Sequence, residues 1–254
     1  MPVTIYLQGL AALIIVGFGG AALAAVRHEG GFPQRYRRTW RTTGLALLLI
    51  GVSASLQNVH GALAIFHGEG SRAWNGYMRW APAWNHGREA VLFALALLLL
   101  ASALAPRRLR VDRGWTPALA LLGACAVGSL LGWLEGSLDF APHFRRVAVL
   151  DAIGLLLLAF AVAACMMADV VDRLLIVALV AYAVPLPLNA LWFAWMASHV
   201  NGGWSPSAAS MQVYRIAFDL MGAAVAVQRW RLARRGAYVS GLLPAPVAVR
   251  PLIG

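Results

Sequence analysis

Two residues of opposite charge lie four positions apart in a stretch that is otherwise apolar. Arg215 and Asp219 fall within residues 209–228, and a spacing of four brings both side chains to one face of a helix, where they can form an ion pair. Ionisable groups inside hydrocarbon are costly, so each one is a candidate functional residue. The pair predicts either a polar site within a membrane or an ion pair that makes insertion tolerable.

A second set of polar residues runs along the apolar segment 43–66. Ser53, Gln57 and His60 are spaced four and three apart, which places them on one helical face. This face is unfavourable against lipid, so we expect it inside a helix bundle. It forms either a hydrogen-bonded seam between helices or part of a ligand or proton site.

Depth along the helices groups these residues with others from the same end of the bundle. At about 1.5 Å per residue, His60 and Arg215 each lie about 9 Å below the ends of their segments. Pro185 and Pro187 remove backbone donors just before Asn189, which predicts either a polar opening or a fixed kink. The predicted site for a small polar or anionic ligand consists of Gln57, His60, Asp151, Asn189, Tyr214, Arg215 and Asp219.

Other catalytic and metal-binding patterns are weak. The histidines show no close pair, and His60 and His67 would lie about 10 Å apart along one helix, so we predict no metal site and no cofactor. Asp169 and Asp172 form a D-x-x-D that resembles a fragment of the magnesium-binding motifs of membrane prenyl and phosphatidyl transferases. The following residues, DVVDRLLIVAL, lack the rest of those motifs. A solvated turn is the plainer interpretation, and a membrane transferase is the alternative.

The composition shows which elements must position these residues. The 254-residue chain is 61% hydrophobic and only 12% charged, whereas a soluble domain is about 45–50% apolar and about 25% charged. A helix needs about 20 mostly apolar residues to cross a bilayer. Seven segments meet that requirement, and they predict an all-α integral membrane protein in which residues 1–235 form a seven-helix transmembrane domain and 236–254 a flexible cytoplasmic tail. The segments are 5–26, 43–66, 89–106, 116–134, 147–168, 174–197 and 209–228.

The placement of the arginines predicts the orientation. The chain has no lysine, so a mechanism based on a lysine Schiff base is excluded. Fifteen of the 21 arginines fall on one side of the predicted bundle and five on the other, including Arg88 in a predicted outer loop over 67–88. Positive charge gathers on the cytoplasmic side, so we expect the N-terminus outside, the C-terminus in the cytoplasm and a multi-pass location in the plasma (inner) membrane.

Charge and small residues also predict partners. The net charge of +11 is an excess on the predicted cytoplasmic side and suits anionic lipid headgroups. Because membrane topology explains this charge, it is not an argument for a nucleic-acid partner. Arginine-rich inner loops are the expected contact for a cytoplasmic signalling partner. Gly128, Gly132 and Gly136 form two overlapping GxxxG units, which favour close helix packing within the bundle or, alternatively, a homodimer contact.

The predicted layout is similar to that of microbial rhodopsins and other seven-helix receptors. The lysine that binds retinal in those photoreceptors is missing, and Arg215 and Asp219 occupy that region. A covalent pigment is therefore excluded. We expect a sensor or receptor-like protein more than an enzyme. The alternatives are a small-solute or proton-coupled transporter, a rhodopsin-like bundle without covalent retinal, and an accessory subunit of a membrane complex.

Overall fold

The fold is all-helical over the part of the chain that the computed structural model describes, which is residues 3–28, 32–105, 115–136, 138–199 and 206–235. This confirms the predicted fold class at the level of secondary structure. The helices are α1 (Val3–Arg27), α2 (Gln34–His67), α3 (Arg72–Leu104), α4 (Thr116–Glu135), α5 (Phe140–Met167), α6 (Arg173–Ala183), α7 (Pro185–His199) and α8 (Pro206–Arg234).

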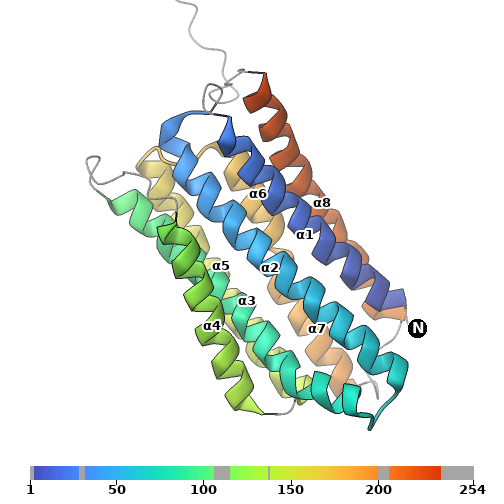
Figure 1. Cartoon of the computed structure of the whole chain (residues 1–254). Helices are drawn as coiled ribbons and strands as arrows, with labels where there is room; N and C mark the ends of the chain where they lie inside the picture. Colours follow the sequence, from blue (N-terminus) through green and yellow to red (C-terminus); the bar gives the residue numbers. More distant parts are fainter. Residues whose placement is uncertain (1–2, 29–31, 106–114, 137, 200–205, 236–254) are drawn as a thin grey trace, which may run out of the picture.

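The long helices lie side by side in one bundle (Figure 1). Helix α1 packs between α2 and α8, and α3 packs against α2, α4 and α5. Helix α5 contacts α7, and α8 contacts both α6 and α7. The start of α1 and the end of α8 lie at opposite ends of the bundle (Figure 1).

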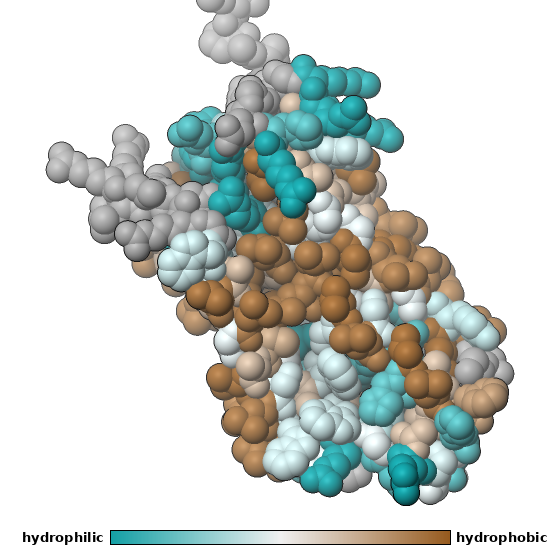
Figure 2. Space-filling model, viewed as in Figure 1, coloured by the Kyte–Doolittle hydropathy of each residue, from teal (hydrophilic) through white to brown (hydrophobic). Residues whose placement is uncertain are grey.

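The surface and the helix lengths both suit a bilayer. Six helical segments of the described chain are long and apolar enough to cross a membrane: α1, α2, α3, α4, the segment Ala141–Met167 of α5, and Arg173–Trp195 across α6 and α7. Figure 2 shows an apolar band across the middle of the visible face, with hydrophilic residues at both of its ends. The chain is therefore a multi-pass membrane protein. Helix α8 is less apolar than the six, so the seventh span stays a prediction.

The predicted outer loop over residues 67–88 is wrong, because α3 already begins at Arg72. The Ser71 hydroxyl caps the helix by accepting a hydrogen bond from the Trp74 amide at 3.1 Å. Pro82 lies inside α3 and cannot donate to the Met78 carbonyl. The amide of Leu138 donates to that carbonyl instead, at 2.8 Å, so the α4–α5 connection supplies the missing partner. The Trp, Gly and Asn residues of this segment indicate a loop, and the tertiary contacts override that local signal.

The two halves of the bundle are filled differently. The apolar core occupies the half at the arginine-rich end, where Phe18, Trp40, Leu99 and Leu175 are almost completely buried. Towards the other end the helices enclose a polar cavity. The prolines of the predicted span 174–197 separate α6 from α7 at Val184 and lie at the border between the two halves. The predicted tail, residues 236–254, lies outside the described residues.

Candidate functional site

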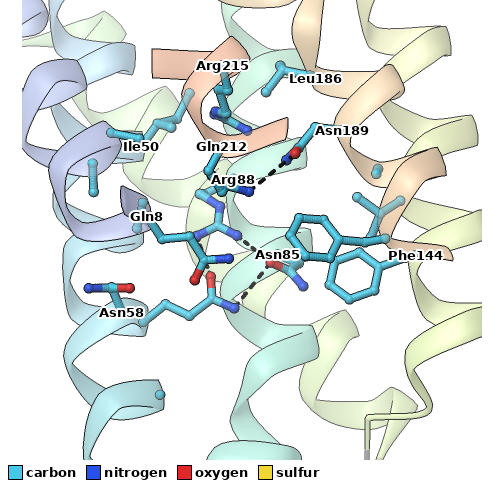
Figure 3. Close-up of a pocket in the computed structure, with 18 of the residues that line it drawn as sticks. Gln8, Ile50, Asn58, Asn85, Arg88, Phe144, Leu186, Asn189, Gln212 and Arg215 are labelled. Atoms are coloured by element: carbon cyan, nitrogen blue, oxygen red, sulfur yellow. Dashed lines mark hydrogen bonds between the residues drawn. The ribbon is translucent and has the colours of Figure 1, made fainter. Parts of the chain in front are cut away.

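A polar cavity of about 190 Å³ lies between the helices in the half of the bundle opposite the arginine-rich end (Figure 3). Seven helices, all but α4, supply its described walls. Its polar lining residues include Gln8 of α1, Gln57 and Asn58 of α2, Tyr77, Asn85, Arg88 and Glu89 of α3, Asp151 of α5, Tyr182 of α6, Asn189 of α7, and Gln212 and Arg215 of α8.

Of the polar face predicted for α2, only Gln57 lines this cavity. Ser53 is buried and Gln57 lines the cavity. The neighbouring Val52, Leu56 and Val59 are exposed on the outside of the bundle. Because α2 has these polar residues inside the bundle and these apolar residues outside, it is suited to a lipid environment.

Arg88 brings a positive charge into the cavity without a carboxylate partner. Its guanidinium donates hydrogen bonds to the side-chain oxygens of Gln57 and Asn85, and Gln57 also donates to Asn85 at 3.3 Å. Among the described residues, no carboxylate forms an ion pair with Arg88. Two neutral amides therefore hold the guanidinium in place (Figure 3).

Arg215 also lines the cavity, but its charge is balanced within its own helix. Its Nε lies 3.4 Å from Oδ2 of Asp219, which is completely buried behind it. This confirms the ion pair predicted from the spacing. The Asp219 Oδ1 is buried without a hydrogen-bond partner among the described residues, so Arg215 compensates the carboxylate incompletely.

A further contact closes the side of the cavity formed by α7 and α8. Gln212 of α8 donates to the side-chain oxygen of Asn189 at 3.3 Å (Figure 3). The prolines at the start of α7 direct the chain so that Asn189 lines the cavity, one turn after the break. The amide pair thus joins the broken span to α8 beside Arg215.

The residues predicted for the ligand site are only partly brought together. Gln57, Asp151, Asn189 and Arg215 line the cavity. The other three lie apart from its lining. His60 packs edge-to-face on Tyr77 with ring centroids 5.7 Å apart, Asp219 lies behind Arg215, and Tyr214 contributes to a separate apolar depression with Trp192 and Trp195.

The main residue missed by the sequence analysis is Arg88. Arg88 falls in the loop predicted over residues 67–88, because the Trp, Gly and Asn residues around it are typical of a loop and not of the first half of α3. One signal was available: Arg88 and Glu89 lie three and four positions after Asn85, a spacing that brings polar side chains together on a helix. Only the contact with Gln57, 31 positions away, shows that Arg88 points into the bundle.

A network of histidines and carboxylates lies beside the cavity, where α3, the end of α4 and the start of α5 meet. His86 Nε2 lies 2.6 Å from Glu135 Oε2, and His143 Nδ1 lies 3.2 Å from Glu135 Oε1. His86 Nδ1 is 2.7 Å from Glu89 Oε2, and His143 Nε2 is 2.8 Å from the side-chain nitrogen of Asn85. Glu89 and Asn85 also line the cavity, so the network touches it directly.

The D-x-x-D carboxylates make tertiary contacts at the opposite, arginine-rich end. Asp169 pairs with Arg35 and accepts a hydrogen bond from the Tyr36 hydroxyl at 2.9 Å. Asp172 caps α6 by accepting from the Leu175 amide at 2.9 Å and also accepts from Trp40 at 3.1 Å. Burial raises the pKa of Asp172 above its ordinary value, and the Leu175 amide and Arg229 act in the opposite direction. These contacts favour a structural role for both carboxylates.

Comparison with known proteins finds no relative: no protein-family model, no curated protein and no solved structure matches the chain. The cavity and its side chains are therefore the basis for any functional conclusion.

Proposed function

We propose that the chain is a seven-span, receptor-like sensor of the plasma membrane, with its N-terminus outside and its C-terminus in the cytoplasm. Its ligand would be a small carboxylate that enters the cavity from the outer side. The observation that carries the proposal is the Arg88 guanidinium, which lines the cavity and is held only by neutral amide oxygens. Arginine presents a planar fork of donors that matches a carboxylate.

The size and charge of the cavity narrow the ligand class. A volume of about 190 Å³ corresponds to roughly six water molecules at about 30 Å³ each, so the ligand has only a few heavy atoms. Asp151, which is buried and lines the same cavity, supplies an acceptor. This favours a carboxylate that also carries a hydroxyl or ammonium donor over a simple fatty acid.

The test is calorimetric titration of the full chain in lipid nanodiscs with acetate, lactate and glycine. We expect lactate or glycine to bind more tightly than acetate. Arg88→Gln is expected to weaken binding of all three about 10–100-fold, since hydrogen bonds to a charged group contribute about 1.5–3 kcal/mol. Asp151→Asn is expected to remove the preference for lactate or glycine while acetate still binds.

The matched control is Arg79→Gln. Arg79 lies on the same helix but is exposed and stacks on Trp133, with 5.2 Å from its guanidinium carbon to the ring centroid. This variant is expected to bind as the wild type does. If none of the three probes binds, or if Arg88→Gln binds them equally well, the proposal is wrong.

The second candidate is a small-solute transporter that uses the same cavity. The specific observation in its favour is the break between α6 and α7 beside the cavity, because interrupted helices commonly line transport sites. Uptake of radiolabelled lactate or glycine into proteoliposomes separates the two functions. Binding without saturable flux supports the sensor, whereas flux that Arg88→Gln abolishes supports the transporter.

A further inference from the structure

We propose that His86, His143 and Glu135 form a binding site for a zinc ion at the outer end of the bundle. The three residues each offer one ligand atom, and these atoms all lie within 4.8 Å of one another. Two imidazoles and one carboxylate are a ligand set that zinc accepts, with water in the fourth position. This site is separate from the proposed carboxylate site and does not depend on it.

The distances are close to those that zinc requires. Ligand atoms that are about 2.0–2.1 Å from a tetrahedral zinc lie roughly 3.3 Å from one another. His143 Nδ1 and Glu135 Oε1 are already 3.2 Å apart, and His86 Nε2 and Glu135 Oε2 are 2.6 Å apart. These two contacts involve different oxygens of Glu135, so on zinc binding the carboxylate would exchange its hydrogen bonds to the two rings for a bond to the ion, and the three ligand atoms would move from within 4.8 Å of one another to the tetrahedral spacing.

A second, independent observation is the partner of His86 on its other side. Glu89 Oε2 lies 2.7 Å from His86 Nδ1. With the Nδ1 proton held by Glu89, Nε2 would bind the metal once the ion replaces its contact with Glu135. Carboxylates commonly orient metal-binding histidines in this way. The Glu89 side chain is only 7% exposed, and its other oxygen is buried without a hydrogen-bond partner among the described residues. A cation on the far side of the ring would stabilise this buried carboxylate.

The backbone holds the three ligands together. Gly128 and Gly132 let α4 approach α3 closely, since a Cβ atom on Gly128 would lie 2.4 Å from the His86 carbonyl oxygen. The Leu138 amide, which donates to the carbonyl freed by Pro82 in α3, fixes the α4–α5 connection. Glu135 at the end of α4 and His143 in the first turn of α5 are thus brought to His86.

Two neighbouring side chains, the charged Arg146 and the neutral Asn85, affect the site. Arg146 pairs with the same Glu135 carboxylate, but its side chain is 54% exposed and free to turn outward. Asn85 presents its nitrogen to His143 Nε2 while its oxygen accepts from Arg88. A metal on Nδ1 leaves the His143 proton on Nε2, so the Asn85 amide must turn and release Arg88. If the proposed function holds, zinc would thus strengthen carboxylate binding at Arg88.

The experiment measures binding of Zn²⁺ by calorimetry, and of Co²⁺ by its absorption spectrum, to the full chain purified without a histidine tag. We expect one ion per chain and a tetrahedral Co²⁺ spectrum. His86→Gln, His143→Ala and Glu135→Gln are each expected to weaken Zn²⁺ binding at least 100-fold. His60→Ala and His67→Ala are the controls, and both are expected to bind as the wild type does.

The Arg146→Gln variant is expected to raise the zinc affinity several-fold, because it removes a cation that competes for Glu135. Misfolding could explain a loss of binding but not this gain. The inference is overturned if the wild type binds no Zn²⁺ or Co²⁺, or if the controls weaken binding as much as the ligand variants do. Zinc titration without any carboxylate tests this site alone, so its result is distinguishable from failure of the proposed function. Enhanced lactate or glycine binding in the presence of zinc, lost in Asn85→Ala, tests the link between the two sites.

Discussion

Single residues show two ways in which this bundle accommodates a partly buried cation. Arg215 and Asp219 form an ion pair within one helix, and this contact could be predicted from their spacing. Arg88 is held by amide groups of α2 and α3, and nothing in the local sequence identifies Gln57 as its partner. The paired arginine is readily explained as a structural element, whereas the amide-held arginine is suited to an incoming anion.

Removal of Asp219 tests the structural role of the ion pair. Asp219→Ala leaves the Arg215 charge without its carboxylate, and loss of one member of a buried pair costs about 3 kcal/mol. We therefore expect a clear fall in the midpoint temperature of thermal unfolding in detergent. Unfolding is measured by the change in tryptophan fluorescence. The double variant Arg215→Met with Asp219→Leu is expected to recover most of that loss, because no charge is left buried. An unchanged midpoint in Asp219→Ala would show that the pair does not stabilise the bundle.

At the scale of the elements, the packing of α4 on α3 determines whether the histidine network forms. Gly128 and Gly132 were predicted to allow close helix contact, and the structure places both against α3 of the same chain. Gly136 instead ends α4 with a φ of 94°, which favours glycine. The homodimer contact through these glycines stays a prediction.

Enlargement of Gly132 tests this contact. A Cβ atom there would lie 2.4 Å from the Pro82 carbonyl oxygen, so Gly132→Val must push α4 away from α3. We expect a lower thermal midpoint and weaker zinc binding. Gly123→Ala is the matched control on the same helix, because its Cβ would meet nothing within 4 Å and alanine favours a helix by about 1 kcal/mol. Equal effects of the two substitutions would contradict the close α3–α4 contact.

At the scale of the whole molecule, one half of the bundle is closely packed and the other is hollow. The packed half lies at the arginine-rich end, where Asp172 connects α2, α6 and α8 through Trp40, Leu175 and Arg229. The hollow half encloses the cavity and adjoins the histidine network. A packed end and a hollow end suit a protein whose ligand enters from one side of the membrane.

The proposed orientation can be tested by chemical labelling. Glu69 and Arg173 are exposed and lie at opposite ends of the bundle. In a background without Cys125 and Cys165, a membrane-impermeant maleimide is expected to label Glu69→Cys in intact cells and Arg173→Cys only after permeabilisation. Green fluorescent protein fused after Gly254 is expected to be fluorescent, whereas alkaline phosphatase fused there is expected to be inactive. The reverse pattern would invert the proposed topology and move the cavity to the cytoplasmic side.

The sequence by itself determined the features that depend on one helix at a time. Apolar length predicted the membrane helices, and a separation of four predicted the Arg215–Asp219 pair. The spacing of Ser53, Gln57 and His60 predicted an inward face of α2, on which Ser53 is buried and Gln57 lines the cavity, whereas His60 packs on Tyr77. These features follow from the periodicity of a helix and the cost of polar groups in lipid.

Only the tertiary structure decided which helix faces meet. His86 and Glu135 are 49 positions apart, and Asn85 and His143 are 58 positions apart. Their contact depends on the close α3–α4 packing at glycine and on the Leu138–Met78 hydrogen bond. Periodicity gives the face of a helix on which a residue lies but does not give the neighbouring helix or its rotation. For that reason the role of Arg88 and the histidine network can be identified only in the packed bundle.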